Sequence, residues 1–142
     1  MIGLVEFLRA RLDEDGQAAR AAMWDDDQSA VWTARPPQAS YEQYIVADYC
    51  DDGVVVVTPE NADADSVGEH IARHDPARVL AEVDAKRRIL DEFVTSQNER
   101  DEEYDETFGL TDWEFEPTAL PLLRLLALPY ADHPDYRDEW RP

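Results

Sequence analysis

The sequence predicts an α+β fold, and three observations carry that prediction. Apolar residues recur at helical spacing near the N-terminus, β-branched and aromatic residues fill the middle, and a helix–corner–helix pattern follows. The 142 residues are enough to bury a single core, so we expect residues 1–142 to form one domain. The expected order is an N-terminal helix, a three-stranded antiparallel β-meander, a short helix, a long amphipathic helix and a C-terminal leucine-rich helix.

The first helix is expected over residues 1–24, running from about Ile2 to Met23. Its apolar stripe consists of residues three to seven positions apart on one face: Leu4, Leu8, Leu12, Ala19 and Met23.

The β-meander is expected over residues 30–58, with strands at Ala30–Arg35, Tyr41–Tyr49 and Val54–Thr58. Because residues 54–57 are all valine, we expect a central strand that is covered on both faces. Residues 50–53 read as a hairpin loop in which Gly53 takes a left-handed conformation.

The helix–corner–helix pattern covers residues 66–100. Ser66 and Glu69 have the spacing of a capping box, which predicts the start of the short helix. Asp75 and Pro76 are a capping carboxylate and a first-turn proline, so they predict a corner at His74–Asp75 and a new helix from Pro76. The long helix is expected to bury a stripe of Leu80, Val83, Leu90 and Val94.

Residues 101–116 read as an acidic connector, because the run D-E-E-Y-D-E is too repulsive for a helix interior. Residues 117–142 read as a segment docked on the core. Its stretch Thr118–Leu128 has six leucines in eleven residues, which predicts a helix buried on all sides. This apolar surface exceeds what a small body covers, which favours homo-oligomers formed through the leucine-rich segment. Trp140 is expected to pack back onto the body.

The charge balance restricts the partners. With 33 acidic and 13 basic residues the net charge is −20, so the surface repels nucleic-acid phosphates and anionic lipids. We therefore expect neither direct nucleic-acid binding nor membrane binding. Cys50 is a single cysteine, no stretch is long and apolar enough to span a bilayer, and the N-terminus lacks a basic signal-peptide region. These features predict a cytoplasmic protein.

Three segments carry a resemblance to a family. They are F-L-R-A-R-L-D-E-D (Phe7–Asp15), the helix–corner–helix core from Glu69 to Leu90, and L-R-L-L-A-L-P-Y-A-D-H-P-D-Y-R-D-E-W (Leu123–Trp140). Together they resemble an uncharacterised family of short acidic actinobacterial and actinophage proteins, a domain of unknown function. The resemblance implies a phage or prophage context and no particular activity.

His70 and His74 are four residues apart, the spacing at which one helix presents two imidazoles to a metal ion. Side chains that could complete such a site are Cys50, Asp75, Asp132 and His133. The alternative is structural, with His70 facing the sheet and His74 bonded to backbone at the corner. The sequence leaves both readings open.

A catalytic centre is not indicated. Cys50 is followed by Asp51 and Asp52, whose charges disfavour the reactive thiolate. No glycine-rich phosphate loop and no nucleophile or zinc-protease motif occurs, and no cofactor is implied. We therefore expect a protein that is not an enzyme.

The acidic block Asp91–Glu116 holds eleven acidic residues and one basic residue. Four aromatic residues are interleaved with the acids: Tyr104, Phe108, Trp113 and Phe115. Aromatic anchors with steering charge predict a docking surface for a basic protein partner. Alternatives are a nucleic-acid-mimicking inhibitor and a purely solvated connector. The sequence thus predicts an acidic accessory or interaction protein, with a metal- or small-molecule-binding protein using His70 and His74 as the alternative.

Overall fold

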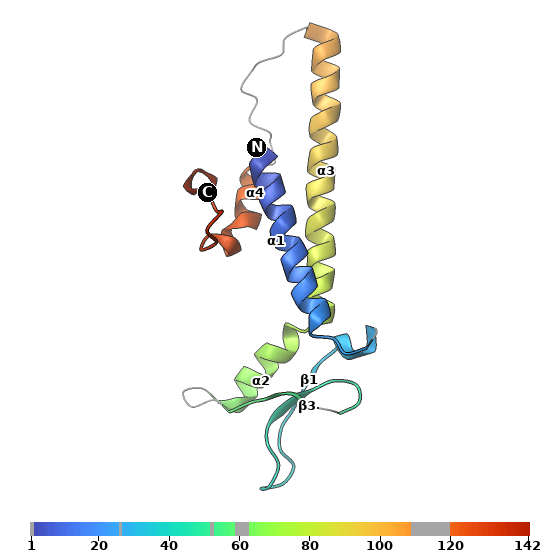
Figure 1. Ribbon diagram of the computed structural model, residues 1–142, viewed down its shortest axis with the longest axis vertical. Helices are drawn as coiled ribbons and strands as arrows, with labels where there is room; N and C mark the ends of the chain where they lie inside the picture. The colour runs from blue at the N-terminus through green and yellow to red at the C-terminus, as the bar shows by residue number, and fades with distance from the viewer. Residues whose placement is uncertain (1, 26, 52, 59–62, 109–119) are drawn as a thin grey trace. The chain divides into compact units, whose positions relative to one another are not determined.

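The structure, a computed structural model, describes residues 2–25, 27–51, 53–58, 63–108 and 120–142. It confirms the α+β fold and the expected order of elements (Figure 1). The α-helices are α1 (Ile2–Ala21), α2 (Ala64–Arg73), α3 (Pro76–Phe108) and α4 (Leu120–Ala127). The strands are β1 (Thr33–Arg35), β2 (Ile45–Ala47) and β3 (Gly53–Val56), and the 3-10 helices are η1 (Asp27–Ala30), η2 (Leu128–Tyr130) and η3 (Asp138–Trp140).

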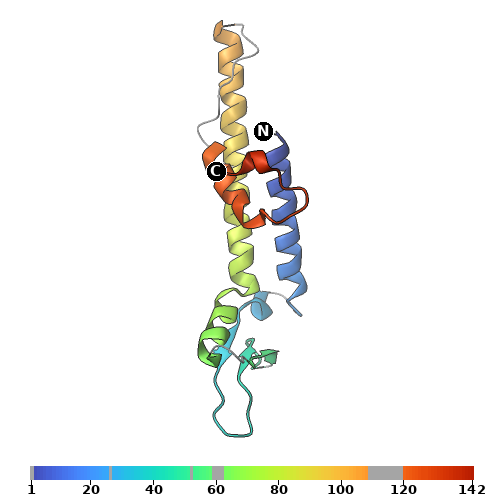
Figure 2. The same cartoon turned by 90° about the vertical axis from the view of Figure 1, so that its left-hand side faces the viewer.

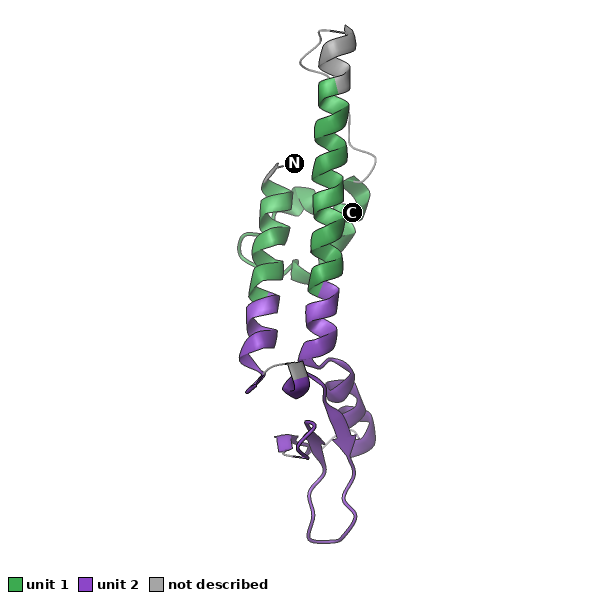
Figure 3. Cartoon of the chain, turned by 90° about the vertical axis from the view of Figure 1, so that its right-hand side faces the viewer, with its two compact units in different colours: residues 1–14, 83–142 green, residues 15–82 purple. Residues whose placement is uncertain are grey.

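The chain divides into two compact units, shown in different colours in Figure 3. Unit 1 contains Met1–Glu14 and Val83–Pro142, and unit 2 contains Asp15–Glu82. The boundary falls inside α1 and α3, so each of these helices contributes residues to both units. That one domain covers the whole chain stays a prediction.

In unit 1 the first part of α1 lies beside α3 (Figure 2). Of the expected stripes, Leu4, Leu8 and Leu12 on α1 and Val83 and Leu90 on α3 are buried there, whereas Val94 is half-buried. Each fully buried leucine contributes roughly 1.5–3 kcal/mol relative to an exposed one. Ion pairs between the helices add to this packing: Arg9 with Asp91 at 3.0 Å, and Arg87 with Asp13.

The C-terminal segment brings several aromatic rings to Phe7. The ring centroid of Phe7 lies 5.0 Å from that of Trp140 and 5.9 Å from that of Tyr136. Trp140 is buried, so the expectation that it packs back onto the body is confirmed. The guanidinium of buried Arg11 stands over Phe7, 5.2 Å from the ring centroid.

The leucine-rich helix is not buried on all sides. On α4, Leu123 and Ala127 are buried, whereas Leu122, Leu125 and the following Leu128 are exposed. The prediction was wrong because a helix of eight residues presents only one face to its neighbours. Self-association through the exposed leucines stays a prediction.

In unit 2 the helix–corner–helix pattern is confirmed, but its first helix begins before the expected capping box. Asp63 is the N-cap of α2, and its carboxylate accepts a hydrogen bond from the Ser66 amide at 3.0 Å. Ser66 is therefore a donor in the first turn and not the cap. At the corner, the Asp75 carboxylate caps α3 by accepting from the Arg78 amide at 2.9 Å.

The sheet has the order β1-β2-β3, with both pairs antiparallel. The central strand is β2, whose Val46 and Ala47 are fully buried. The expectation that residues 54–57 form a covered central strand was wrong: Val54, Val55 and Val56 are exposed, and Val57 alone of the four is buried. The contacts of α2 with the sheet are mainly with β1 and β2.

The loop between β2 and β3 contains a residue with a left-handed backbone, as expected, but that residue is Asp51 with a φ of 60°. The prediction assigned this conformation to Gly53, which instead begins β3. Aspartate tolerates the left-handed region better than most residues with a side chain.

Helix α3 continues to Phe108 and does not end at Arg100. The prediction that residues 101–106 form a connector was therefore wrong. Each residue added to an existing helix gains one backbone hydrogen bond without a new nucleation cost, and this outweighs exposed like-charge repulsion of a few tenths of a kcal/mol per pair.

We expect Gly68→Ala to destabilise the protein by about 1–2 kcal/mol, because overpacking costs more than the gain in helix propensity. A Cβ at Gly68 would overlap the buried Tyr44 ring, lying 2.9 Å from its Cζ. The matched control is Gly3→Ala in α1, where the nearest atoms belong to the flexible Arg137 side chain at 3.6 Å or more. This control should be neutral or slightly stabilising in chemical denaturation. Equal stabilities of the two variants would contradict the packing of Tyr44 against α2.

Candidate interaction surface

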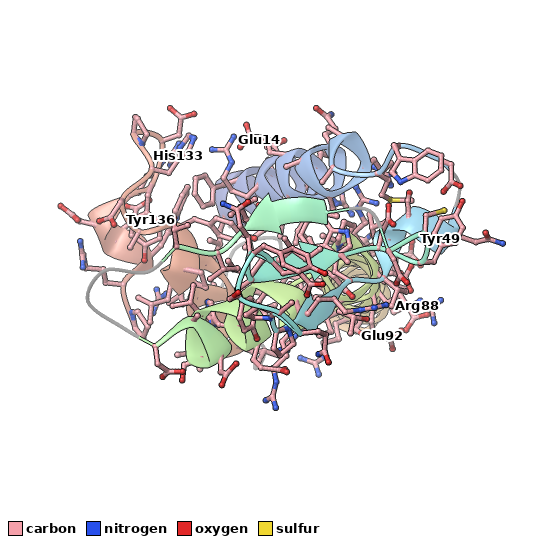
Figure 4. The ribbon with its side chains drawn as sticks, turned by 90° about the horizontal axis from the view of Figure 1, so that it is seen from below. Glu14, Tyr49, Arg88, Glu92, His133 and Tyr136 are labelled. Atoms are coloured by element: carbon pink, nitrogen blue, oxygen red, sulfur yellow. The ribbon has the colours of Figure 1, made fainter. Side chains whose placement is uncertain are left out.

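Two aromatic residues from separate parts of unit 2 stack on each other. Trp24 follows the end of α1 and Tyr49 follows the end of β2. Their ring centroids are 5.8 Å apart and their planes differ by 10° (Tyr49 is labelled in Figure 4). Trp24 is nevertheless 62% exposed and Tyr49 47% exposed. We call Trp24 and Tyr49 the aromatic pair.

A carboxylate fixes each ring of the aromatic pair. The indole Nε1–H of Trp24 donates to Asp48 at 2.5 Å, and the hydroxyl of Tyr49 donates to Asp25 at 2.6 Å. Asp48 is buried, and its other oxygen accepts from the Cys50 amide at 2.9 Å. Each ring is therefore held by a hydrogen bond to a residue adjacent in sequence to the other ring.

Ser29 holds the Asp25 carboxylate in place. The Ser29 amide donates to Asp25 Oδ1 at 3.1 Å, and the Ser29 hydroxyl donates to the Asp25 carbonyl oxygen at 3.1 Å. The amides of Trp24 and Asp25 lie 3.2 Å from the same hydroxyl. Because Ser29 is fully buried, this turn positions Asp25 from the inside of the unit.

These contacts shift the pKa values of Asp25 and Tyr49 in opposite directions. The hydrogen bond from Tyr49 is the largest cause that holds the pKa of Asp25 below its ordinary value of 3.8, followed by opposing desolvation and the bonds from Ser29. The same bond to Asp25 raises the pKa of the Tyr49 hydroxyl above 10.0. At neutral pH the pair therefore presents a charged carboxylate beside two neutral rings.

The predicted metal ligands lie elsewhere in unit 2. The rings of His70 and His74 are close, with centroids 4.4 Å apart, and both residues are exposed. Nδ1 of His74 donates to the His70 carbonyl at 2.7 Å, as in the structural reading. Asp75, a suggested third ligand, accepts from the amides of Trp32 and Arg78.

Among the described residues, no group of three or more His, Cys, Asp or Glu side chains could hold a metal ion. Two other suggested ligands, Asp132 and His133, belong to unit 1. Nη1 of Arg11 lies 2.8 Å from Nδ1 of His133, while Nη2 donates to Glu14 at 2.7 Å (Figure 4). Metal binding by His70 and His74 stays a prediction.

Two of the four predicted aromatic anchors of the acidic block belong to α3. Tyr104 and Phe108 fall in the last turns of α3, where the backbone alone is described. Trp113 and Phe115 lie outside the described residues.

Sequence reasoning missed the aromatic pair. Each ring has a nearby acidic residue in sequence, Trp24 before Asp25 and Tyr49 after Asp48, and this juxtaposition was the available signal. The pairing itself joins residues 25 positions apart through the sheet, which a local pattern does not show.

The chain belongs to the family described as "Family of unknown function (DUF6221)", which matches it over residues 1–142. This confirms the expected membership of a family of unknown function. No curated protein and no solved structure matches the chain. None of the helices in the described part of the chain is long and apolar enough to cross a membrane.

We expect Tyr49→Phe to raise the pKa of Asp25 toward 3.8, because the variant loses the hydroxyl that donates to the carboxylate. A lowered pKa in the folded state stabilises the protein above the unfolded-state pKa, and this stabilisation is lost as the pH falls through the folded-state pKa. The stability difference between wild type and variant that arises from this bond should therefore shrink below about pH 4. Carboxyl ¹³C NMR titration measures the pKa directly.

Tyr41→Phe is the matched control, since Tyr41 is 86% exposed and its removal should leave the Asp25 titration unchanged. In the reciprocal variant Asp25→Asn, the pKa of Tyr49 should fall toward 10.0, seen as earlier tyrosinate absorbance in an alkaline titration. An Asp25 titration identical in wild type and Tyr49→Phe would contradict the hydrogen bond.

Proposed function

We propose that this member of a family of unknown function is a non-enzymatic interaction protein that binds a basic protein partner through the aromatic pair of unit 2. The observation that carries the proposal is a stacked tryptophan and tyrosine that remain largely exposed while carboxylates hold their polar atoms. Exposed aromatic residues of this kind are the side chains that dominate binding energy at protein interfaces.

The chemistry of the aromatic pair suits an arginine or lysine side chain. The face of an indole ring attracts a cation, an interaction that contributes roughly 0.5–2 kcal/mol depending on how far it is desolvated. Asp25 and Asp48 add negative charge within hydrogen-bond distance of the same rings. A planar guanidinium can stack on the exposed part of Trp24 and pair with a nearby carboxylate, so arginine is favoured over lysine.

The rings are fixed before a partner arrives. Both hydrogen bonds restrain side chains that would otherwise lose rotamer freedom on binding, at a cost of about 0.5–1.5 kcal/mol for each side chain. Burial of Asp48 and Ser29 anchors these restraints in the body of unit 2. A restrained aromatic surface therefore binds more tightly than the same residues on a flexible loop.

The stretch of sequence that carries the aromatic pair is rich in acidic residues, and this supports a basic partner. Residues 24–63 include nine acidic residues and one basic residue, Arg35, which pairs with Asp51. An excess of one sign raises the rate of encounter with an oppositely charged partner and disfavours acidic ones. The proposal thus keeps the basic partner expected from the sequence and places its contact in unit 2.

A blocked hexapeptide of alternating arginine and serine should bind the wild-type protein in isothermal titration calorimetry, and more weakly as salt is raised. Trp24→Ala should weaken this binding about tenfold or more, because it removes the exposed stacking face. Tyr41→Ala is the matched control, since it removes an even more exposed aromatic residue of unit 2 that lies outside the aromatic pair.

A second peptide, with glutamate in place of arginine, controls for charge. Equal losses in Trp24→Ala and Tyr41→Ala would show that the aromatic pair is not the binding site. Indistinguishable titrations with the arginine and glutamate peptides would overturn the proposal of a basic partner.

A further inference from the structure

The two outer strands of the sheet differ in how their edges are protected. Strand β1 ends at Arg35 and is followed by Pro36 and Pro37, and charges and prolines block the addition of another strand. Strand β3 ends the sheet on the other side, and residues 53–57 contain neither a charge nor a proline. Asp51 and Asp52 precede this stretch and Pro59 and Glu60 follow it, so the edge without charge or proline is limited to residues 53–57.

The side chains of β3 are apolar and exposed. Val54, Val55 and Val56 are 37%, 37% and 47% exposed. Successive residues of a strand point to opposite faces, so apolar surface is available on both sides of this strand. Helix α2 packs mainly on β1 and β2, and these three valines keep more than a third of their surface exposed.

The backbone of β3 can pair with a further strand. The Val57 amide donates inward to the Tyr44 carbonyl at 2.8 Å. In an antiparallel ladder the pairing groups alternate, so the N–H and C=O of Val56, opposite Ile45, are directed away from β2. An extended segment laid along β3 would thus gain backbone hydrogen bonds as well as contacts with the valines.

The negative charge of the chain favours a basic protein over a second copy of this chain as the binding partner of the β3 edge. A second copy would bring another net charge of −20 and the same acidic excess around its own sheet. A basic segment instead neutralises that excess, and Tyr49 lies in the connection between β2 and β3, next to this edge in sequence. The aromatic pair and the β3 edge can therefore serve one basic partner.

We propose that β3 accepts an extended basic segment of the partner as a fourth strand of the sheet. This inference rests on the proposed function and specifies how the partner binds. The partner contributes a segment that alternates arginine or lysine with apolar residues. Its cations face the acidic surface and the aromatic pair, and its backbone pairs with Val56.

The test compares two blocked hexapeptides of alternating arginine and valine, one of which is N-methylated on alternate amides of the pairing edge. Both carry the same charges and side chains, but the methylated peptide cannot donate hydrogen bonds along that edge. The unmodified peptide should bind wild type about tenfold or more tightly than the methylated one. It should also slow hydrogen exchange of the Val56 amide, observed by ¹⁵N NMR.

Two variants test whether the preference for the unmodified peptide depends on the N–H of Val56. Val56→Pro removes the outward N–H and should abolish the preference for the unmodified peptide, whereas Val56→Thr keeps the N–H and a β-branched side chain and should retain it. The comparison of peptides on wild type stands even where Val56→Pro perturbs folding.

Equal affinity of wild type for both peptides, with binding still lost in Trp24→Ala, would overturn strand addition and leave the proposed function intact. Failure of both peptides, together with failure of the arginine–serine peptide, would overturn both proposals. A concentration-dependent dimer that Val56→Pro dissociates, without peptide binding, would assign the edge to a second copy instead.

Discussion

Unit 2 depends on carboxylates that accept hydrogen bonds from neutral donors. Asp63 caps α2 with the Ser66 amide, and Asp75 caps α3 while also accepting from the Trp32 amide at 3.1 Å. In the aromatic pair, Asp48 accepts a hydrogen bond from the Trp24 indole and Asp25 accepts one from the Tyr49 hydroxyl. The constraint behind this pattern is composition, because the unit has fourteen acidic and four basic residues. At these four carboxylates the donors are backbone amides, an indole and a phenol, and not the side chains of arginine or lysine.

In unit 1, arginine side chains pair with several of the carboxylates. Arg9 and Arg87 pair with aspartates of the neighbouring helix, and Arg11 is buried against Glu14, His133 and the Phe7 ring. Exposed pairs of this kind contribute little, typically below about 1 kcal/mol. Unit 2, taken by itself, keeps an excess of ten acidic over basic residues.

The sequence predicted what depends on local patterns. Leu4, Leu8 and Leu12 mark the buried face of α1, and Asp75 with Pro76 marks the start of α3, because spacing and capping are properties of neighbouring residues. It failed for residues 54–57, since four valines suit a buried strand and an exposed edge equally well. Whether these valines are buried or exposed depends on tertiary packing against the sheet, which a local sequence pattern does not show. The aromatic pair was missed for the same reason.

The proposed site and the fold of unit 2 use the same groups, and this couples binding to stability. Asp25 and Asp48 restrain the rings, yet each adds to a negative charge that opposes compaction of the unit. A bound cation relieves that repulsion in the folded state more than in the expanded unfolded chain, where the charges are further apart. A ligand that binds the folded state alone stabilises it by mass action. In the proposed function, a basic partner would supply to unit 2 the countercharge that its own sequence lacks, so the partner's affinity and the stability of the unit would rise together.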